Sequence, residues 1–464
     1  MKKEQKSKNE DGVSRRKFVA GASAAGAAAA VLPIESSAQV AGSDAVKVGM
    51  IGMGGRGSGA IVQNLTANDS SQLYACADAF QDKIDGTGPR ASGLPKIAKQ
   101  LEKIGKGKQV DLPQSRQYAG FDAYKAVIDE CDLVVIATPP GFRPIHFEYA
   151  VEQGKNVFME KPVCVDAWGY NKVIEAAKMA DQKNLKVVVG LQRHYQNVYL
   201  EAYKKVHEEG LIGDIVGAQV WWNGSRPWIV KREPGWTEME YQMRNWYHFN
   251  WLCGDHIAEQ HVHNIDVMNW FLSGDSVAGG HPVSAQGMGG RAGTEPLSVG
   301  EIFDHHYVEF RYGNEHNNAV MNSQCRQIKN TWKKVAEEIH GSEGILHLGN
   351  GRITDLKGEV KWQYRAPRSG DPNPYQVEHD RLYAAIREDT PLNNAYYGAK
   401  SSFTSVLGRL ATASGQEISW DEAVKSNFSI MPEEFDMNAE APVKPGENGD
   451  YELAIPGDWK LPWA

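Results

Sequence analysis

The chain has 464 residues, more than one ordinary hydrophobic core accommodates, so we expect two domains behind any targeting segment. Its 50 Lys and Arg residues against 58 Asp and Glu residues give a formal net charge of -8. This acidic balance argues against nucleic acid as a partner and offers no polybasic patch for a membrane surface.

The first 38 residues have the pattern of an export signal. Ser14-Arg15-Arg16-Lys17-Phe18 follows a Lys-rich start and precedes an Ala/Gly-rich segment, and small residues surround Ala38. This pattern is typical of a twin-arginine signal, whose route carries folded proteins. The apolar part is shorter than the ~20 residues of a membrane-spanning helix. We therefore expect cleavage near Ala38, a periplasmic product and no permanent membrane anchor; a basic tail before a short helix is the alternative.

A glycine-rich turn follows the first expected strand. The apolar run 46–51 ends at Gly52, and Gly52, Gly54 and Gly57 have G-x-G-x-x-G spacing before a helical pattern that starts near Ala60. In a dinucleotide-binding unit these glycines form a tight turn, admit a pyrophosphate and pack helix on strand. A plain glycine-rich loop is the alternative. The residues expected to contact a dinucleotide here are Gly52, Met53, Gly54, Arg56 and Gly57.

The second expected strand, 72–77, ends at Asp78. A carboxylate at this position accepts hydrogen bonds from the adenosine ribose hydroxyls and repels a 2′-phosphate. The sequence therefore favours NAD over NADP. Because the periplasm has no NAD pool, we expect the cofactor to be tightly bound.

Strands and helices alternate as far as residue 191. Further buried strands are expected at 133–137, 156–159 and 186–190, with helices at 121–129, 145–153 and 167–182 between or after them. This alternation predicts an α/β, doubly wound parallel sheet, a Rossmann domain over residues 39–191.

From residue 214 onward the expected strands are longer and alternate in polarity, as at 215–222, 305–312 and 319–328. This pattern predicts an α+β domain over residues 192–464 with an open, mainly antiparallel sheet. The open face of such a sheet is a natural interface, so we expect a homodimer or homotetramer. Five cysteines scattered through apolar segments predict buried free thiols.

A polar segment, 254–266, lies between expected strands of the second domain. If it is one helix, Glu259 and His263 share a face and form a proton-transfer pair, with His263 titrating near neutral pH. A solvated polar face is one alternative. A metal site of His256, Glu259 or His261, and His263 is another. We expect no metal, because the dinucleotide already accepts electrons.

Five short motifs occur in order along the chain: Gly52-Met53-Gly54-Gly55-Arg56-Gly57, Ala137-Thr138-Pro139, Gly154-Lys155-Asn156-Val157, Glu160-Lys161-Pro162 and His263-Asn264-Ile265-Asp266. Together they resemble the motifs of the Gfo/Idh/MocA oxidoreductases over about residues 46–330. The resemblance implies that Lys161 lies near the nicotinamide and the substrate hydroxyl. It also implies that Glu259, where Asp is commoner, and His263 are catalytic. Thr138, Pro139 and Glu160 join the expected cofactor site.

Residues that follow the strand at 186–190 are candidates for substrate binding. Arg193 and Tyr195 lie where ligands of open α/β sheets bind and can hydrogen-bond sugar hydroxyls. Pairing of Arg193 with a core acid is an equal alternative. His261 stands where the family usually has Gly, so it is also expected beside the substrate.

Together these features predict an NAD-dependent oxidoreductase that oxidises a secondary hydroxyl of a sugar, polyol or glycoside. Lys161 would accept the hydroxyl proton. The first alternative is a glycosidase of the same family, in which NAD transiently oxidises the ring and the leaving group is eliminated. The second is a non-catalytic sugar-binding protein.

Overall fold

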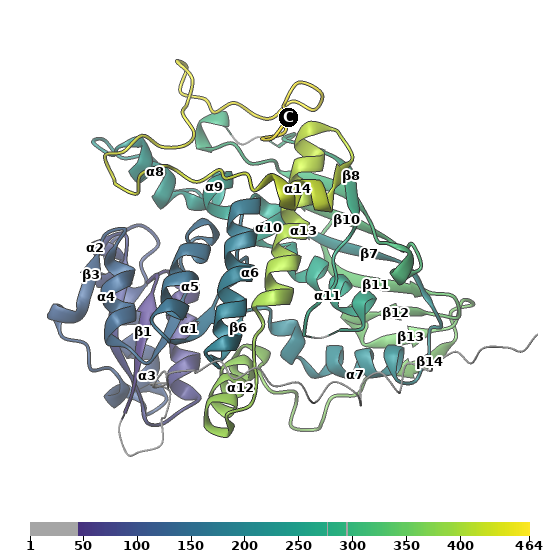
Figure 1. The fold of residues 1–464 in the computed structure, drawn as a ribbon, viewed down its shortest axis with the longest axis horizontal. Coiled ribbons are helices and arrows are strands. Elements are labelled where there is room, and N and C mark those ends of the chain that lie inside the picture. Colours follow the sequence, from purple (N-terminus) through teal and green to yellow (C-terminus); the bar gives the residue numbers. More distant parts are fainter. Residues whose placement is uncertain (1–44, 276, 294–295) are drawn as a thin grey trace, which may run out of the picture. The chain divides into compact units, whose positions relative to one another are not determined.

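The computed structural model describes residues 45–275, 277–293 and 296–464. The expected export signal, residues 1–38, lies outside these described residues. Figure 1 shows two sheets, the first from the N-terminal part of the described chain and the second from later residues. No helix in the described ranges has the length and apolar character that crossing a bilayer needs.

The first sheet has six parallel strands in the order β3-β2-β1-β4-β5-β6. Residues of β4, β5 and β6 are buried throughout, as expected of parallel strands covered on both faces. This confirms the predicted doubly wound sheet; the short β3 was not predicted. The strands are β1 (Val46–Ile51), β2 (Ser71–Asp78), β3 (Gln117–Ala119), β4 (Leu133–Ile136), β5 (Asn156–Met159) and β6 (Val187–Val189).

Helices cover both faces of this sheet, and each face has its own hydrophobic cluster. One cluster includes residues of α4, α5 and α6, and the other includes residues of α1, α3 and the distant α12. The later part of the chain thus returns to complete the N-terminal domain. These helices are α1 (Gly55–Thr66), α2 (Gln81–Asp85), α3 (Gly93–Lys103), α4 (Ala123–Glu130), α5 (Arg143–Glu152), α6 (Ala167–Gln182) and α12 (Pro374–Glu388).

The second sheet has nine strands in the order β14-β13-β12-β11-β7-β10-β9-β8-β15. Only the β7–β10 pair among these is parallel. The prediction of a mainly antiparallel sheet is confirmed. The parallel pair joins two strands that are about 100 residues apart in the sequence. The strands are β7 (Ile215–Gly224), β8 (Ser284–Gly290), β9 (His305–Arg311), β10 (Val320–Gln327), β11 (Lys334–Gly341), β12 (Ile345–His347), β13 (Arg352–Thr354), β14 (Val360–Gln363) and β15 (Ile418–Ser419).

Helices α10, α11 and α13 pack against the nine-stranded sheet, and α13 also contacts α6 of the first domain (Figure 1). Burial of almost every residue of α13 makes it the shared core element. The remaining helices are α7 (Asn197–His207), α8 (Glu238–Arg244), α9 (Asn250–Cys253), α10 (His256–Glu259), α11 (Val262–Ser273), α13 (Ala395–Ser414) and α14 (Trp420–Ser426).

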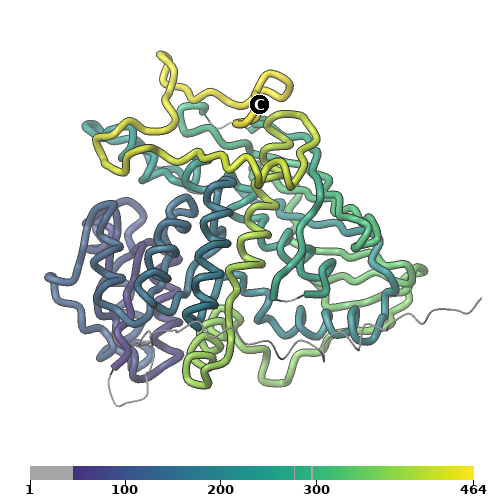
Figure 2. Tube along the Cα trace, in the orientation of Figure 1, coloured from purple at the N-terminus to yellow at the C-terminus, as the bar shows by residue number. Residues whose placement is uncertain are grey.

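The last residues after α14 form an irregular arm that runs alongside α8 and α9, as the yellow tube in Figure 2 shows. Side chains of the α8 region anchor it: Thr237 donates to the carbonyl of Met437, and Gln242 donates to that of Val443. The five cysteines are all buried and free, which confirms that prediction.

Candidate active site

The glycine-rich loop between β1 and α1 has the geometry of a phosphate cradle. Gly52 has φ +97°, and a Cβ there would lie 2.7 Å from the carbonyl carbon of Ala137. A Cβ on Gly57 would lie 2.1 Å from the Gly52 oxygen, whereas a Cβ on Gly54 would meet nothing within 4 Å. Gly52 and Gly57 are therefore required by packing, and Gly54 leaves open space.

The N-terminus of α1 faces this space. Gly54 is the extended N-cap and offers no side chain to the first turn. Ser58 makes the first helical hydrogen bond, to the Gly54 oxygen at 2.9 Å, so the N–H groups of residues 55–57 have no intrahelical acceptor. Free N–H groups and the positive end of the helix dipole suit a pyrophosphate.

Asp78, at the carboxyl end of β2, both shapes this loop and lines the cavity beside it. Its Oδ2 accepts a hydrogen bond from the Met53 N–H at 2.8 Å, and its Oδ1 accepts one from the Phe80 N–H at 3.1 Å. Burial raises the pKa of this carboxyl to about 6. Each oxygen keeps a lone pair with which to accept a ribose hydroxyl.

A cavity of 640 Å³ joins the loop to the second domain. It starts at Gly54, Arg56 and Asp78, passes Thr138 and Pro139 after β4, and reaches α8 and the end of α10. The lining residues from the second domain include Trp228, Met243, Arg244, Trp246, Tyr247, Glu259 and Gln260. The cavity therefore has room for a cofactor and is lined by side chains of both domains.

Glu160 supports the loop from beneath. It is buried and forms an ion pair with Arg56 Nε. Arg56 Nη2 also lies 3.4 Å from Glu378 of α12, and its guanidinium stacks on the Tyr375 ring. Burial and the neighbouring Glu160 raise the pKa of Glu378 well above its usual value. Arg56 thus links the cofactor loop to two buried acids.

Lys161 contacts Glu259 across the two domains. Its Nζ donates to the Glu259 carbonyl and lies 3.4 Å from the Glu259 carboxylate, both side chains being nearly buried. The carbonyl is free because the expected helix is interrupted: α10 ends at Glu259, and His263 N bonds instead to the Gln260 oxygen. The prediction of one continuous helix was wrong, and Lys161 fills the gap in its hydrogen bonds.

His263 is the second residue of α11, and it stacks on Trp222 with 5.8 Å between ring centroids. Its Nδ1 has no hydrogen-bond partner among the described residues. Burial, Lys161, Arg193 and Arg56 hold its pKa well below the usual value. This direction differs from the expected Glu259-supported base titrating near neutral pH, because burial and the three cations lower the pKa of His263.

The three predicted substrate-binding side chains have protein partners. His261 is fully buried, with Nε2 at 2.8 Å from Ser323 Oγ of β10. Arg193 forms a buried ion pair with Glu337 of β11, which confirms the alternative of a core acid. Tyr195 donates from its hydroxyl to Asn394 Oδ1 at 2.6 Å. In this structure each of the three side chains therefore satisfies a polar group of the protein, and none of the three lines the cavity.

Aromatic and cationic residues that lie outside the sequence motifs also line the cavity. Trp228 and Trp246 meet edge to face at 5.8 Å, and the Arg90 guanidinium lies 4.2 Å from the Trp228 ring centroid. The density of tryptophans at 221–251 was a usable signal for these walls. Arg90, in the long connection after α2, had none.

Together the parallel sheet, the cradle and Asp78 define a dinucleotide-binding domain of the Rossmann class. Residues of this domain and of the α+β domain line the same cavity. Residues 46–191 match the model of the Gfo/Idh/MocA oxidoreductases, described as "Oxidoreductase family, NAD-binding Rossmann fold". Residues 46–191 are thus similar to the NAD-binding domain of that family.

Longer stretches of the chain are similar to individual proteins. The chain is 24% identical to an inositol 2-dehydrogenase of Rhizobium meliloti (strain 1021) over 58% of this chain and 74% of that protein. It is 33% identical to a glycosyl hydrolase family 109 protein of Solibacter usitatus (strain Ellin6076) over 33% of each chain. The match to an uncharacterized oxidoreductase of Streptococcus pneumoniae, at 25% identity, spans 50% of this chain and only 55% of that protein.

The fold of both domains recurs in a solved structure. Levoglucosan dehydrogenase in complex with NADH and levoglucosan superposes with a TM-score of 0.58 over 81% of this chain and 99% of that chain, at 16% identity. The two-domain architecture is therefore shared with this dehydrogenase.

Proposed function

We propose that this protein is an NAD-dependent oxidoreductase of the Gfo/Idh/MocA family that oxidises a secondary hydroxyl of a sugar, polyol or glycoside. The observation that carries the proposal is the Lys161–Glu259 contact, because Glu259 lines the cavity from the cofactor cradle where it reaches the second domain. Similarity to an inositol 2-dehydrogenase supports the substrate class.

Bound NAD would accept the hydride from the substrate carbon. The proton of the same hydroxyl needs an acceptor in the protein. We assign this role to Lys161 as the neutral amine, which forms when its ammonium passes a proton to Glu259. Burial raises the pKa of Glu259, so this carboxyl can hold a proton that Lys161 passes on. Neutral His263, close to Lys161, hydrogen-bonds the substrate rather than acting as the base.

The walls of the cavity suit a carbohydrate. Trp228, Trp246 and Tyr247 offer apolar faces for the C–H side of a sugar ring, and Arg244 and Gln260 offer donors for its hydroxyls. Arg244 is held in place by ion pairs with Asp82 and Glu240.

The cofactor is NAD rather than NADP, and it is tightly bound. Asp78 presents a carboxylate at the ribose end of the cradle. Two of the nearby cations are already engaged: Lys83 donates to the Pro89 carbonyl, and Arg90 stacks on Trp228. Export through the twin-arginine route to the periplasm rests on the sequence of residues 1–38, and assembly into a homodimer or homotetramer rests on the open sheet.

A glycoside hydrolase that recycles NAD is the second candidate, favoured by the similarity to glycosyl hydrolase family 109 proteins. The same Lys161 and Glu259 would then serve transient oxidation, and the oxidised ring would lose its leaving group by elimination. The two activities differ in net product. A non-catalytic sugar-binding protein is the third.

A panel of free sugars, polyols and nitrophenyl glycosides tests these alternatives. We expect net NADH with at least one unsubstituted sugar or polyol and no nitrophenol beyond background. Nitrophenol release without net NADH identifies the hydrolase instead. Binding of a sugar with neither product refutes both enzymatic proposals.

A further inference from the structure

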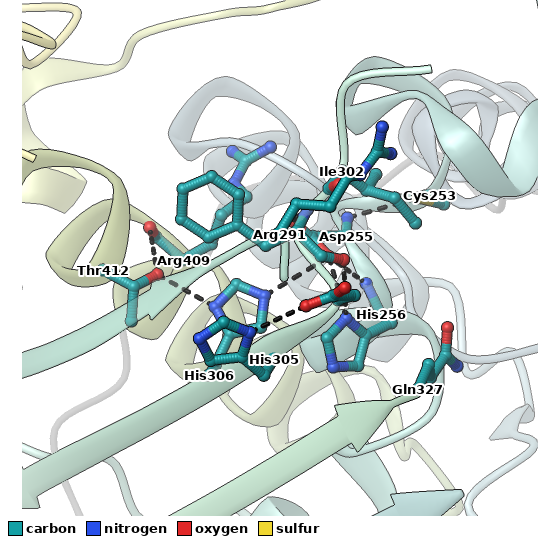
Figure 3. Close-up of polar contacts among 12 residues, drawn as sticks. Cys253, Asp255, His256, Arg291, Ile302, His305, His306, Gln327, Arg409 and Thr412 are labelled. Atoms are coloured by element: carbon teal, nitrogen blue, oxygen red, sulfur yellow. Dashed lines mark hydrogen bonds and ion pairs between the residues drawn. The ribbon is translucent and has the colours of Figure 1, made fainter. Parts of the chain in front are cut away.

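A second polar cluster lies at the start of α10, behind the wall that carries Glu259. It consists of Asp255, His256 and, from β9, His306, and Figure 3 shows both imidazoles directed at the Asp255 carboxylate. His256 Nδ1 lies 3.1 Å and His306 Nε2 lies 3.3 Å from Asp255 Oδ1. All three side chains are at most 2% exposed.

Hydrogen bonding around His306 determines its tautomer. Thr412 Oγ1 lies 2.9 Å from His306 Nδ1 and donates its one proton to the carbonyl of Arg409, also at 2.9 Å. A hydroxyl has a single proton, so His306 Nδ1 must be the donor toward Thr412. In the neutral ring Nε2 then carries a lone pair, and this lone pair faces a carboxylate oxygen.

The second imidazole of the cluster also faces oxygen atoms. His256 Nδ1 is near two acceptors, Asp255 Oδ1 and the Phe303 carbonyl at 3.2 Å. His306 Nε2 has no hydrogen-bond partner within the described part of the chain. A buried lone pair opposite a carboxylate is unfavourable unless a cation lies between them.

We propose that this cluster binds one divalent first-row transition-metal ion of the zinc class through Asp255 Oδ1, His256 Nδ1 and His306 Nε2. Two imidazoles and one carboxylate are ligands that Zn²⁺ and its neighbours prefer. This set differs from the one considered from sequence, because His261 and His263 point elsewhere and the partner histidine comes from β9.

The surroundings have the features of a supported metal site. Thr412 fixes the His306 ring through its second nitrogen, and the Phe303 N–H donates to Asp255 Oδ2 at 3.0 Å. Asp255 and Phe303 also line a second cavity, of 750 Å³, bounded by the C-terminal arm. This cavity provides a route for the ion and room for a further ligand.

The metal would stabilise the position of Glu259 in the candidate active site. Asp255 and His256 start the short helix that ends at Glu259, whereas His306 belongs to the sheet. An ion shared by them ties α10 to β9 and holds Glu259 against Lys161. The assignment rests on the cluster alone, so it stands apart from the proposed oxidoreductase activity.

Elemental analysis of the purified full chain tests the proposal. We expect about one zinc, iron, cobalt or manganese ion per chain, lost in His306→Ala and in Asp255→Asn. His305→Ala is the matched control, since His305 is the adjacent residue of β9, 40% exposed at its side chain, and bound to Asp304. It should keep the metal.

Cobalt substitution provides a second readout that needs no variant. Chelated wild-type protein given Co²⁺ should develop d–d absorption bands in the visible range and regain thermal stability. Wild-type protein that is free of metal and shows no bands with Co²⁺ would overturn the proposal, leaving a proton on His306 as the shared cation. Metal loss in His305→Ala would overturn the ligand assignment.

Discussion

At the scale of residues, the Lys161–Glu259 contact replaces the pair expected from spacing. Glu259 and His263 are four residues apart, yet the chain breaks its helix between them, and the carbonyl left free accepts from Lys161. The two groups of the proposed relay therefore come from different domains. We expect them to act as one unit.

Substitution of either member should lower turnover strongly. Lys161→Met and Glu259→Gln should each reduce kcat by ~10²- to 10⁴-fold, because general acid–base catalysis is worth about that much. The double variant should be little worse than the poorer single variant. Steady-state kinetics with saturating NAD measures this, and Lys172→Met, whose ammonium pairs with Glu148, is the control. Fully multiplicative losses would show separate roles.

Asp78 should make NAD affinity depend on pH. Its pKa of about 6 lies above the ordinary 3.8, so the carboxylate that accepts the ribose hydroxyls is lost as pH falls through 6. Affinity should fall from pH 7.5 to pH 5 in the wild type and change much less in Asp78→Asn, as measured by calorimetric titration of cofactor-free protein. Equal pH profiles would contradict the assignment.

The same group affects stability in the opposite sense. A carboxyl whose pKa is raised on folding binds its proton more tightly in the folded state. Its contribution to the unfolding free energy is therefore lost as pH rises between about 3.8 and 6. Cofactor binding and folding thus make opposite demands on Asp78, as expected of a functional residue.

At the scale of elements, α12 completes the cofactor loop from a distance of more than 300 residues. Its Glu378 is fully buried beside Glu160, and Arg56 is the cation between them. Two buried carboxylates without a cation are costly, and the cost rises as they ionise.

Arg56→Met should lower the melting temperature more at pH 8 than at pH 5. The folded pKa of Glu378 is already raised, and removing Arg56 raises it further, so the stability of the variant falls as pH rises above about 4.5. Scanning calorimetry of cofactor-free protein measures this. Gln63→Met, which removes only a neutral partner of Arg56 Nη1, should show no such pH dependence. Equal losses at both pH values would contradict the charge argument.

Many of the helices and strands were predictable from sequence. The buried strands and the glycine spacing are local patterns, and they predicted the parallel sheet and the cradle. The helix break at Gln260 was not predictable, because it depends on Lys161 and on the burial of His261 against Ser323. Arg193 and Glu337 are likewise 144 residues apart, so no local pattern shows that they pair.

At the scale of the whole molecule, the proposed export would depend on cofactor loading. A folded-protein route would allow NAD to be bound before the chain leaves the cytoplasm, and the proposed tight binding would then retain it. Arg15→Lys with Arg16→Lys should therefore leave active, uncleaved protein in the cytoplasm. Cell fractionation and immunoblotting measure this; delivery of the double variant to the periplasm would refute the twin-arginine assignment.

The most direct test of the central claim is a single turnover by the protein as purified. Denaturing a portion first gives the amount of NAD released per chain. Mixing the remainder with a substrate from the sugar panel should raise the absorbance of reduced nicotinamide in one burst. In the wild type and in Lys172→Met, the amount of reduced nicotinamide should match the amount of NAD released. In Lys161→Met, the burst should be at least ~10²-fold slower. An unchanged burst in Lys161→Met, or no reduced nicotinamide with any sugar, would contradict the account.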